Sequence, residues 1–491
     1  MAIKSVAIIG AGAAGAITAA ALRSEDYFER IKVFERRESP GGTWIYDADP
    51  GTGQNVPPGK LPLDIDQPLK VPSNLPITTS PSRANRWTTT PIYESLTTNV
   101  PDIAMSFSDS PFPYGPFVPH RVARQYVESY FSLHGLDALL SLNTTVEDLS
   151  AVPAHSDVEA SGKEKWKLTL RKYDPSRHLD IWWEEFFDAV VIANGHYSVP
   201  YIPDVPGLGD DDRSQTPKVT HSKYYRSPSG LKDKRVVVVG NSASGHDVSA
   251  ECIGVAKHPV YVSRRSRSRW DGDQAPPGIE WKPIIKEFLP GGRIVFVDGT
   301  TLDDVDTVMY CTGYKASFPF WNEKANKGPI WDYEVNKLRD CYWHTFLRNH
   351  PTIAVVGVPR TLTFRSFEYQ AVAIARLWAK RNKFPLPPLA EQEAWELSRI
   401  ERCQREHKKF HDIPWDDGET QTYLNYFFEF AGLGTLHGDG RLPPPLGPDL
   451  IWAIEHIKKY PEPPKHSNEV NSESSDTWTF IDSDCLDTIL Y

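Results

Sequence analysis

The sequence predicts an α/β fold with two Rossmann-like dinucleotide-binding domains, the second of them inserted into the first. Two glycine-rich turns carry this prediction, because "VAIIGAGAAG" near the start is nearly repeated as "VVVVGNSASG" from Val236. Each turn follows a short apolar run and precedes a stretch of helical composition, as in the strand, turn and helix of a dinucleotide site. The 491 residues, 40% of them hydrophobic, are enough for two or three domains.

The first half of the chain supplies a βαβ unit and several further elements. Residues 3–9 predict a strand, "AAGAITAAALRS" predicts a helix, and "IKVFE" predicts the second strand. The proline-rich stretch from Pro50 to Pro91 predicts a loop, either a surface excursion or the lining of an active-site mouth. Beyond it we expect a helix over "HRVARQYVESYFSLHGL", an exposed strand over "KWKLTLRKY" and a buried strand within "FFDAVVIANGHY".

The second half begins with a change of composition. Proline, aspartate and serine between Tyr201 and Ser229 indicate a linker before "KRVVVVGNSASG", and "VDTVMYCTGY" predicts the strand that leads back out of the second unit. A helix is expected over "SFEYQAVAIARLWAKR", whereas the polar run from Pro461 predicts a disordered tail. The predicted boundaries are a first domain over 1–205 and 314–460, an inserted domain over 206–313, and a tail over 461–491.

Composition and charge exclude several classes of function. The chain has 54 Lys and Arg against 64 Asp and Glu, a net charge of −10, which argues against nucleic acid as a partner. The five cysteines include no C-x-x-C pair, so we expect reduced thiols and no metal site. No apolar run reaches the ~18 residues of a membrane span, and the first glycine turn begins too early for a secretory signal. These features favour a cytoplasmic protein, and a homodimer is compatible with them.

The first glycine turn has the residues of a site for a dinucleotide without a 2′-phosphate. Gly10, Gly12 and Gly15 fit G-x-G-x-x-G, which lets the backbone approach a pyrophosphate at the start of a helix. Glu35 lies 35 − 15 = 20 residues after the last glycine, where a carboxylate accepts from ribose hydroxyls and repels a 2′-phosphate. The turn therefore predicts FAD or NAD, and the alternative is a purely structural glycine turn.

The second turn favours a phosphorylated ribose. It carries Gly240, Ser242, Ser244 and Gly245, so that serine replaces one glycine of the pattern. Arg264 and Arg265 stand where the first unit has its acid, and guanidinium groups bind phosphate through paired, charge-assisted hydrogen bonds. We therefore expect NADPH here; the alternative is a solvated arginine face. Because a cysteine pair is missing, O₂ is the expected acceptor of electrons that pass from NADPH to a resident FAD.

Motifs along most of the chain resemble one family. In chain order they are "ERRESPGGTW", "YESLTTNVP", "FSDSPFP", "VIANGHYSVPYIPDVPGL", "VTHSKYYR", "AKHPVYVSRR" and "YCTGY". Their order and distances are similar to those of flavin-containing monooxygenases, above all the soluble yeast-like and fungal branch, from about Ser5 to Arg381. The family's F-x-G-x-x-x-H-x-x-x-[F/Y] fingerprint is only partly kept: Gln215 and Pro217 replace Phe and Gly, while His221 and Tyr225 match.

This resemblance implies an NADPH- and FAD-dependent monooxygenase. NADPH would reduce FAD, O₂ would add to form a C4a-hydroperoxyflavin shielded by NADP⁺, and a soft nucleophile such as a tertiary amine or a sulfide would take one oxygen. Such chemistry needs a dry, oriented pocket more than acid–base side chains, so no catalytic triad is expected. The alternatives are a Baeyer–Villiger monooxygenase, an amine N-hydroxylase, and a non-catalytic NADPH-binding regulatory module.

The resemblance also implies roles for individual residues. The FAD contacts would be Gly10, Gly12, Ala14, Gly15, Glu35, Arg36, Gly42, Thr43, Trp44, Thr98, Asn99 and Gln370. The NADPH contacts would be Gly240, Ser242, Ser244, Gly245, His221, Ser222, Arg264 and Arg265. Asn99, in "TTNVP", is the candidate catalytic residue, because the family amide at this position lies beside the flavin ring and NADP⁺.

Several of these assignments have structural alternatives. Asn99 could instead form an Asx turn before Val100-Pro101. His221 could be a packed linker residue, and Asn194 and His196, which end the strand in "ANGHY", could cap a loop. The aromatic residues of the surrounding segments would line the substrate cavity or close a core; they are Trp44, Tyr93, Phe107, Phe112 and Tyr114.

Overall fold

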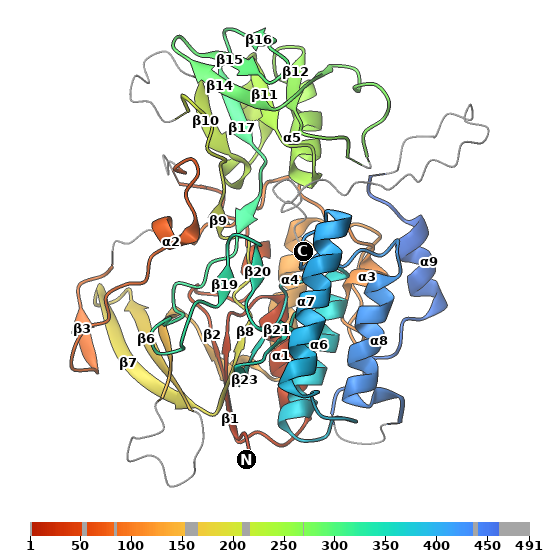
Figure 1. The fold of residues 1–491 in the computed structure, drawn as a ribbon. Coiled ribbons are helices and arrows are strands. Elements are labelled where there is room, and N and C mark those ends of the chain that lie inside the picture. The colour runs from red at the N-terminus through yellow and green to blue at the C-terminus, as the bar shows by residue number, and fades with distance from the viewer. Residues whose placement is uncertain are drawn as a thin grey trace.

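The computed structural model describes residues 2–51, 56–82, 86–152, 165–208, 217–268, 270–435 and 440–460 (Figure 1). Two largely parallel sheets lie one above the other, and each is accompanied by helices (Figure 1). This arrangement confirms the predicted fold class. The predicted tail over 461–491, Gln215 of the fingerprint and Cys485 lie outside the described residues.

The lower sheet is assembled from both halves of the chain. Its strands, in spatial order, are β21 (Cys341–Tyr342), β22 (Phe346–Leu347), β23 (His350–Val355), β8 (Ala189–Ile192), β1 (Ser5–Ile9), β2 (Arg30–Phe34) and β4 (Leu140–Ser141). From β23 to β4 every neighbouring pair is parallel. The carboxyl ends of these parallel strands therefore meet at one edge of the sheet, where open α/β sheets bind their ligands.

Each face of the lower sheet has its own cover, which follows from the alternation of side chains along a strand. On β1, Val6 and Ile8 belong to the core shared with α1 (Ala13–Ser24) and α6 (Thr363–Trp378). Ala7 and Ile9 face the opposite core, which an antiparallel sheet covers. That sheet has the order β3 (Ile77–Thr79), β7 (Leu179–Phe187), β6 (Trp166–Asp174) and β5 (Thr144–Ala151).

Two sequence predictions were wrong in this region. The stretch Pro50–Pro91 is not loop throughout, because it contains α2 (Pro62–Ile65) and strand β3. The strand over "KWKLTLRKY" is not simply exposed, since Trp166, Leu168 and Leu170 are fully buried against the lower sheet. Strand β3 forms because it pairs with β7, and one face of β6 is buried because its sheet packs on the lower sheet. Neither contact can be recognised from the local amino-acid sequence.

The upper sheet is entirely parallel. Its strands, in spatial order, are β10 (Lys218–His221), β17 (Thr307–Tyr310), β11 (Val236–Val239), β12 (Val260–Ser263) and β13 (Ile279–Lys282). Helix α5 (Ala243–Ile253) packs on one face, and a small sheet of β14 (Ile285–Leu289), β15 (Arg293–Phe296) and β16 (Thr301–Leu302) covers the other. The chain enters the upper sheet through its edge strand β10. The segment 201–229, which was predicted as a linker, therefore also contains a strand. The exact domain boundaries remain a prediction.

The two connections between the domains run side by side. Strand β9 (Val199–Pro200), on the way up, pairs antiparallel with β18 (Tyr314–Lys315), on the way back. A second short antiparallel pair, which follows β18 in the chain, is formed by β19 (Trp331–Asp332) and β20 (Lys337–Leu338). The pairing of β9 with β18 thus joins the two crossings between the lower and the upper sheet (Figure 1).

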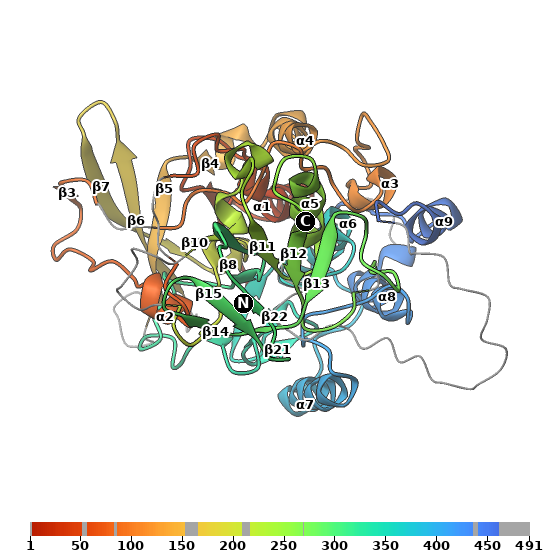
Figure 2. The ribbon, with the colours of Figure 1, turned by 90° about the horizontal axis from the view of Figure 1, so that it is seen from above.

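The remaining helices surround α6 on one side of the molecule, as the view from above shows (Figure 2). They are α3 (Asp102–Met105), α4 (His120–Leu133), α7 (Leu389–Glu406), α8 (Glu419–Ala431) and α9 (Pro448–His456). No helix in the described part of the chain combines the length and the apolar character needed to cross a membrane. The four described cysteines are buried free thiols.

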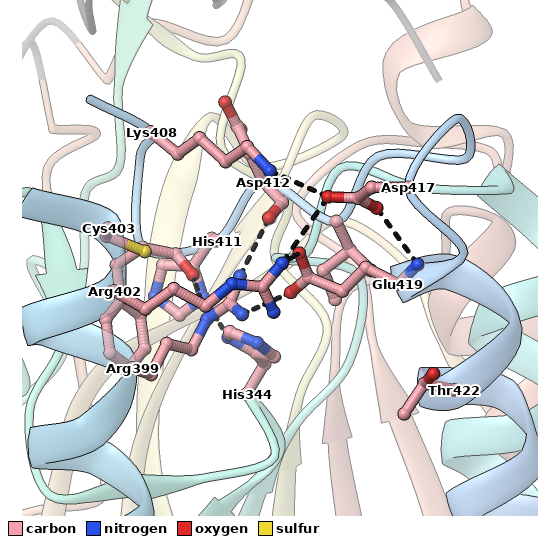
Figure 3. A network of polar contacts seen from close by, with 12 residues as sticks. His344, Arg399, Arg402, Cys403, Lys408, His411, Asp412, Asp417, Glu419 and Thr422 are labelled. Atoms are coloured by element: carbon pink, nitrogen blue, oxygen red, sulfur yellow. Dashed lines mark hydrogen bonds and ion pairs between the residues drawn. The ribbon is translucent and has the colours of Figure 1, made fainter. Parts of the chain in front are cut away.

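A network of ion pairs ties α7 to the start of α8 and to the segment that precedes it (Figure 3). Arg399 pairs with Glu419, and behind this pair the Nδ1 atoms of His344 and His411 lie 2.9 Å apart. Leu338 donates its N–H to His411 Nε2 at 3.0 Å, so the proton of a neutral His411 is on Nδ1 and is donated to His344. Burial lowers the pKa of both imidazoles, and they are therefore neutral in the folded protein.

Candidate functional site

A cleft lies at the carboxyl ends of the four parallel strands β2, β1, β8 and β23. It contains ≈ 900 Å³ of space, open solvent included. The first residues after these strands all contribute to its walls: Gly10 after β1, Glu35 after β2, Ala193 after β8 and Val356 after β23. This is the position at which a doubly wound sheet binds a nucleotide.

The glycines of the first turn are required by close backbone approaches. Gly10 has φ +106°, and a Cβ at this position would lie 2.5 Å from the carbonyl oxygen of Ala193. A Cβ on Gly15 would lie 1.9 Å from the carbonyl oxygen of Gly10. Gly12 is the residue before α1 and faces Gly42, whose Cβ would come within 2.7 Å of Gly12 Cα. The cleft floor is thus bare backbone at the start of a helix, which suits a pyrophosphate.

Glu35 is fixed at the end of β2 by the backbone. Its Oε2 accepts a hydrogen bond from Ala11 N at 2.8 Å, and its Oε1 accepts from Arg37 N at 2.9 Å. Each carboxylate oxygen can accept a further hydrogen bond, and the side chain lines the cleft. Next to it, Arg36 also lines the cleft and donates to the carbonyl oxygen of Arg86 at 3.0 Å. The two carboxylate oxygens are therefore fixed at the cleft surface, and each can accept a hydrogen bond from a hydroxyl group of a ligand.

Three buried polar atoms in the cleft wall have no partner among the described residues. They are Thr89 Oγ1 and, in the short helix that follows Gly41, Thr43 Oγ1 and Trp44 Nε1. Leaving a buried donor unpaired costs roughly 1–3 kcal/mol, so such atoms normally meet a ligand or ordered water. Together with the bare turn and Glu35, they leave the cleft with unused donors and acceptors for a bound ligand.

The second turn, at the upper sheet, repeats this geometry. Gly240 has φ +108°, and a Cβ there would lie 2.7 Å from the carbonyl oxygen of Cys311, while a Cβ on Gly245 would lie 2.0 Å from Gly240 O. Ser242 is the residue before α5, and its Oγ, like Asn241 Oδ1, is buried without a partner among the described residues. The amino end of α5 thus presents one unused donor, the Ser242 hydroxyl, to an anion.

Arg264 is at the end of β12 but already has a partner. Its Nη1 donates to Asp271 Oδ2 at 2.7 Å, and its guanidinium carbon lies 3.4 Å from the ring centroid of Trp281. The same Asp271 oxygen accepts from Asn241 Nδ2 at 2.8 Å and from Ser268 N at 2.9 Å. Asp271 therefore orients both Arg264 and the turn, a role that the sequence analysis missed. Arg265, the next residue, is half-buried at the same strand end.

Asn99 lines a second, smaller pocket between the two domains. This pocket holds ≈ 210 Å³, open solvent included, and Asn99 lines it together with Ala243, the first residue of α5. The adjacent Thr98 is buried, and its Oγ1 accepts from Val118 N at 3.0 Å, which fixes the chain at this point. An Asx turn needs the N–H two residues on, and Pro101 has none, so this alternative fails.

Gln370, His221 and Ser222 are among the predicted contact residues that line neither pocket. Gln370 is fully buried; its Oε1 accepts from Gly357 N at 3.1 Å, so it supports the cleft only through Gly357, which lines it. His221 Nδ1 accepts from Lys223 N at 3.0 Å and its Nε2 donates to Gly313 O at 2.9 Å; burial lowers its pKa to about 3. Its contacts are those of a packed junction residue. Ser222, beside it, is buried as well.

The remaining candidates divide between the site and the core. Asn194 and His196 line the large cleft, although Asn194 Nδ2 also donates to the carbonyl oxygen of Ser317 at 2.9 Å. Among the aromatic residues, Trp44 lines the large cleft and Tyr93 the small pocket, Phe107 and Phe112 are buried in the core, and Tyr114 is 65% exposed.

Sequence reasoning missed Lys223, a fully buried lysine at the domain junction. Its Nζ donates to the carbonyl oxygens of Thr89 and Ser198 at 2.6 and 2.5 Å, and both residues line the large cleft. Burial lowers the pKa of its amino group well below the ordinary value. A lysine in a polar linker gives no signal of burial, so only the fold could reveal it.

Comparisons with known proteins agree with this geometry. Residues 83–271 and 277–430 match the family described as flavin-binding monooxygenase-like, and residues 8–61 match the NAD(P)-binding Rossmann-like domain. The chain is 32% identical over 446 residues to flavin-containing monooxygenase FMO GS-OX-like 9 of Arabidopsis thaliana, covering 88% of this chain and 87% of the relative. Flavin-containing monooxygenase iboF of Amanita muscaria is 27% identical over 448 residues, with 81% and 82% covered.

One solved structure is similar over most of both chains. S-allyl-L-cysteine S-oxygenase from Allium sativum superimposes with a TM-score of 0.69 at 28% identity, covering 88% of this chain and 90% of that one. The similarity includes both sheets, since it extends over nearly nine-tenths of each protein.

Proposed function

Because the chain belongs to the flavin-containing monooxygenase family, we propose that it uses NADPH and O₂ to transfer one oxygen atom to a soft sulfur or nitrogen atom of a small molecule. The observation that carries this proposal is the small pocket that Asn99 lines together with the amino end of α5. In this pocket the candidate amide from the flavin domain lies beside the turn expected to hold NADPH. Reduction by NADPH and transfer of oxygen could therefore take place at one site.

FAD fits the large cleft through residues of this chain. The bare backbone of Gly10, Gly12 and Gly42 would accept its pyrophosphate, Glu35 its ribose hydroxyls, and Thr43 its remaining polar atoms. When bound and reduced, FAD supplies the activation of O₂ that was expected from the sequence. The protein's own contribution is to bind, orient and exclude water.

NADPH fits the second turn. The Ser242 hydroxyl would donate to its pyrophosphate at the start of α5, and Arg264 would meet the 2′-phosphate while stacked on Trp281. Asp271 keeps Arg264 extended but also places a negative charge at this site. The preference for NADPH over NADH therefore depends on the balance between two charges of opposite sign.

Asn99 is proposed as the residue that protects activated oxygen. Its amide can donate and accept hydrogen bonds but does not titrate near neutral pH, so it can hold a polar oxygen without delivering a proton that would release hydrogen peroxide. Leu96 and Tyr93, which line the same pocket and are nearly fully buried, restrict water there.

Sulfur is the favoured acceptor, since the similar garlic protein is an S-oxygenase at 28% identity. The test is to purify the protein with FAD and to follow NADPH consumption with methyl phenyl sulfide, a tertiary amine and cyclohexanone in parallel. Sulfoxide or N-oxide formation coupled to NADPH supports the proposal. A lactone from cyclohexanone would assign Baeyer–Villiger chemistry instead, turnover of only one amine would assign an N-hydroxylase, and a colourless protein that cannot be loaded with FAD would point to a regulatory module.

A further inference from the structure

Asp247, on the second turn of α5, joins three parts of the chain that are distant in sequence. Its Oδ2 accepts from the Tyr93 hydroxyl at 2.5 Å and from Lys459 Nζ at 3.2 Å, and its Oδ1 accepts from the Tyr460 hydroxyl at 2.8 Å. Tyr93 belongs to the flavin domain, Asp247 to the inserted domain, and Lys459 and Tyr460 to the segment after α9. One carboxylate thus connects both domains to this segment.

The segment after α9 also contacts each domain directly. Lys459 Nζ donates to the carbonyl oxygen of Thr97 at 3.3 Å, two residues before the candidate amide. The ring of Tyr460 lies 5.0 Å, between centroids, from the rings of His246 and Trp270. These contacts place the ammonium group against the flavin domain and the phenol ring against the inserted domain.

The polar groups of this cluster satisfy one another. Burial raises the pKa of the Tyr93 and Tyr460 hydroxyls, so both stay protonated and donate to Asp247. Lys459 balances the charge of the carboxylate, and the side chains of both residues are less than one-fifth exposed. A set of donors converging on one half-buried acceptor favours a single arrangement over a mobile one.

We propose that Lys459 and Tyr460 form the outer wall of the small pocket at Asn99 and determine the size of the substrate that reaches it. Both residues line this pocket, and the two domains supply its other walls. Lys459 and Tyr460 are two of the eight residues around this small space, so their side chains decide whether a bulky molecule fits. The inference rests on the proposed function, because Asn99 marks the place of oxygen transfer.

The test compares small and bulky sulfides. For the wild type, Tyr460→Ala and Tyr460→Phe, kcat/KM is measured with ethyl methyl sulfide and with dibenzyl sulfide. Removal of the ring should raise the ratio of dibenzyl to ethyl methyl sulfide about tenfold, the scale on which pocket size discriminates substrates. Tyr460→Phe keeps the ring between His246 and Trp270 and should stay near the wild-type ratio. Selectivity, unlike a rate, does not fall merely because a variant is less stable.

Two further variants separate the wall from general effects. Lys459→Ala loses the contacts to Thr97 and Asp247 and should shift the ratio in the same direction as Tyr460→Ala. Lys458→Ala, at an exposed neighbour, is the matched control and should leave the ratio unchanged. If sulfoxides form but neither Tyr460→Ala nor Lys459→Ala changes the ratio, the inference is overturned.

A measurement without turnover keeps this inference distinct from the proposed function. Acrylamide quenching of the bound flavin's fluorescence reports how open the pocket is, and the quenching constant should increase in Tyr460→Ala and Lys459→Ala relative to Lys458→Ala. If the wild type forms no oxygenated product, the proposed function fails and the quenching result alone decides: an increase supports the wall, and equal quenching in all variants refutes it.

Discussion

Replacing Glu35 by glutamine should weaken FAD binding while leaving the fold intact. The carboxylate accepts from Ala11 N and Arg37 N through different oxygens, and both oxygens keep a free lone pair beside the cleft. A glutamine has one acceptor oxygen, so its amide nitrogen must face one of the two backbone donors or the ribose. The variant therefore loses at least one charge-assisted hydrogen bond to the cofactor.

The expected size of this effect follows from that lost bond. Hydrogen bonds to a charged group contribute roughly 1.5–3 kcal/mol, and each 1.4 kcal/mol is a factor of about ten, so the Kd for FAD should rise roughly 10- to 150-fold. Apoprotein is titrated with FAD and followed by flavin fluorescence, with circular dichroism as the check on folding. Glu38→Gln, at an exposed position nearby, is the control. A Glu35→Gln Kd within threefold of the wild type would refute the assignment of Glu35 to the ribose.

Three further predictions concern oxygen transfer, coenzyme choice and acid stability. Asn99→Ser should still reduce its flavin with NADPH but should release ~10-fold more hydrogen peroxide per product, as expected for one lost hydrogen bond of about 1.4 kcal/mol; full coupling would remove Asn99 from the site. Arg264→Ala should raise KM for NADPH by roughly tenfold or more and leave that for NADH nearly unchanged, with exposed Arg267→Ala as control; equal use of both coenzymes by the wild type would contradict it. Because the pKa values of His344 and His411 lie below the ordinary value, the unfolded chain binds more protons than the folded one at acid pH. The free energy of unfolding should therefore fall as the pH decreases below ~6.5, by up to about 1.4 kcal/mol per pH unit for each residue. If the stability of His344→Gln depended on pH as steeply as that of the wild type, this prediction would be wrong.

The dinucleotide turns were predictable because their signal is local. The helix expected over "AAGAITAAALRS" is α1 at the same bounds, Ala13–Ser24, and the strand before it is β1. Glu35 could be placed because a βαβ unit fixes the distance along the chain between the turn and the end of the second strand. Glycine spacing and apolar periodicity thus carried both the fold class and the floor of the large cleft.

Asp271 and Gln370 show where local signals fail. Asp271 orients Arg264 through an ion-paired hydrogen bond from the following loop. The arginine that was expected to be free for a phosphate therefore already has a carboxylate partner. Gln370 was assigned to the cofactor from the family resemblance; its side chain accepts from Gly357 N, and a contact with the cofactor stays a prediction. In both cases the residue type was informative, and the partner was decided by the packing of distant segments.

The sequence by itself determined that this protein has two dinucleotide turns on parallel sheets, one beside an acid and one beside arginines, because strand, turn and helix signals depend on neighbours within about 20 residues. Only the tertiary structure decided how the two sites meet. Asn99, Asp247 and Tyr460 come from three segments separated by well over 100 residues, and nothing in their local sequence specifies that they share a pocket. Burial of the sheet faces and pairing of the domain crossings bring them together, since these contacts depend on the whole chain.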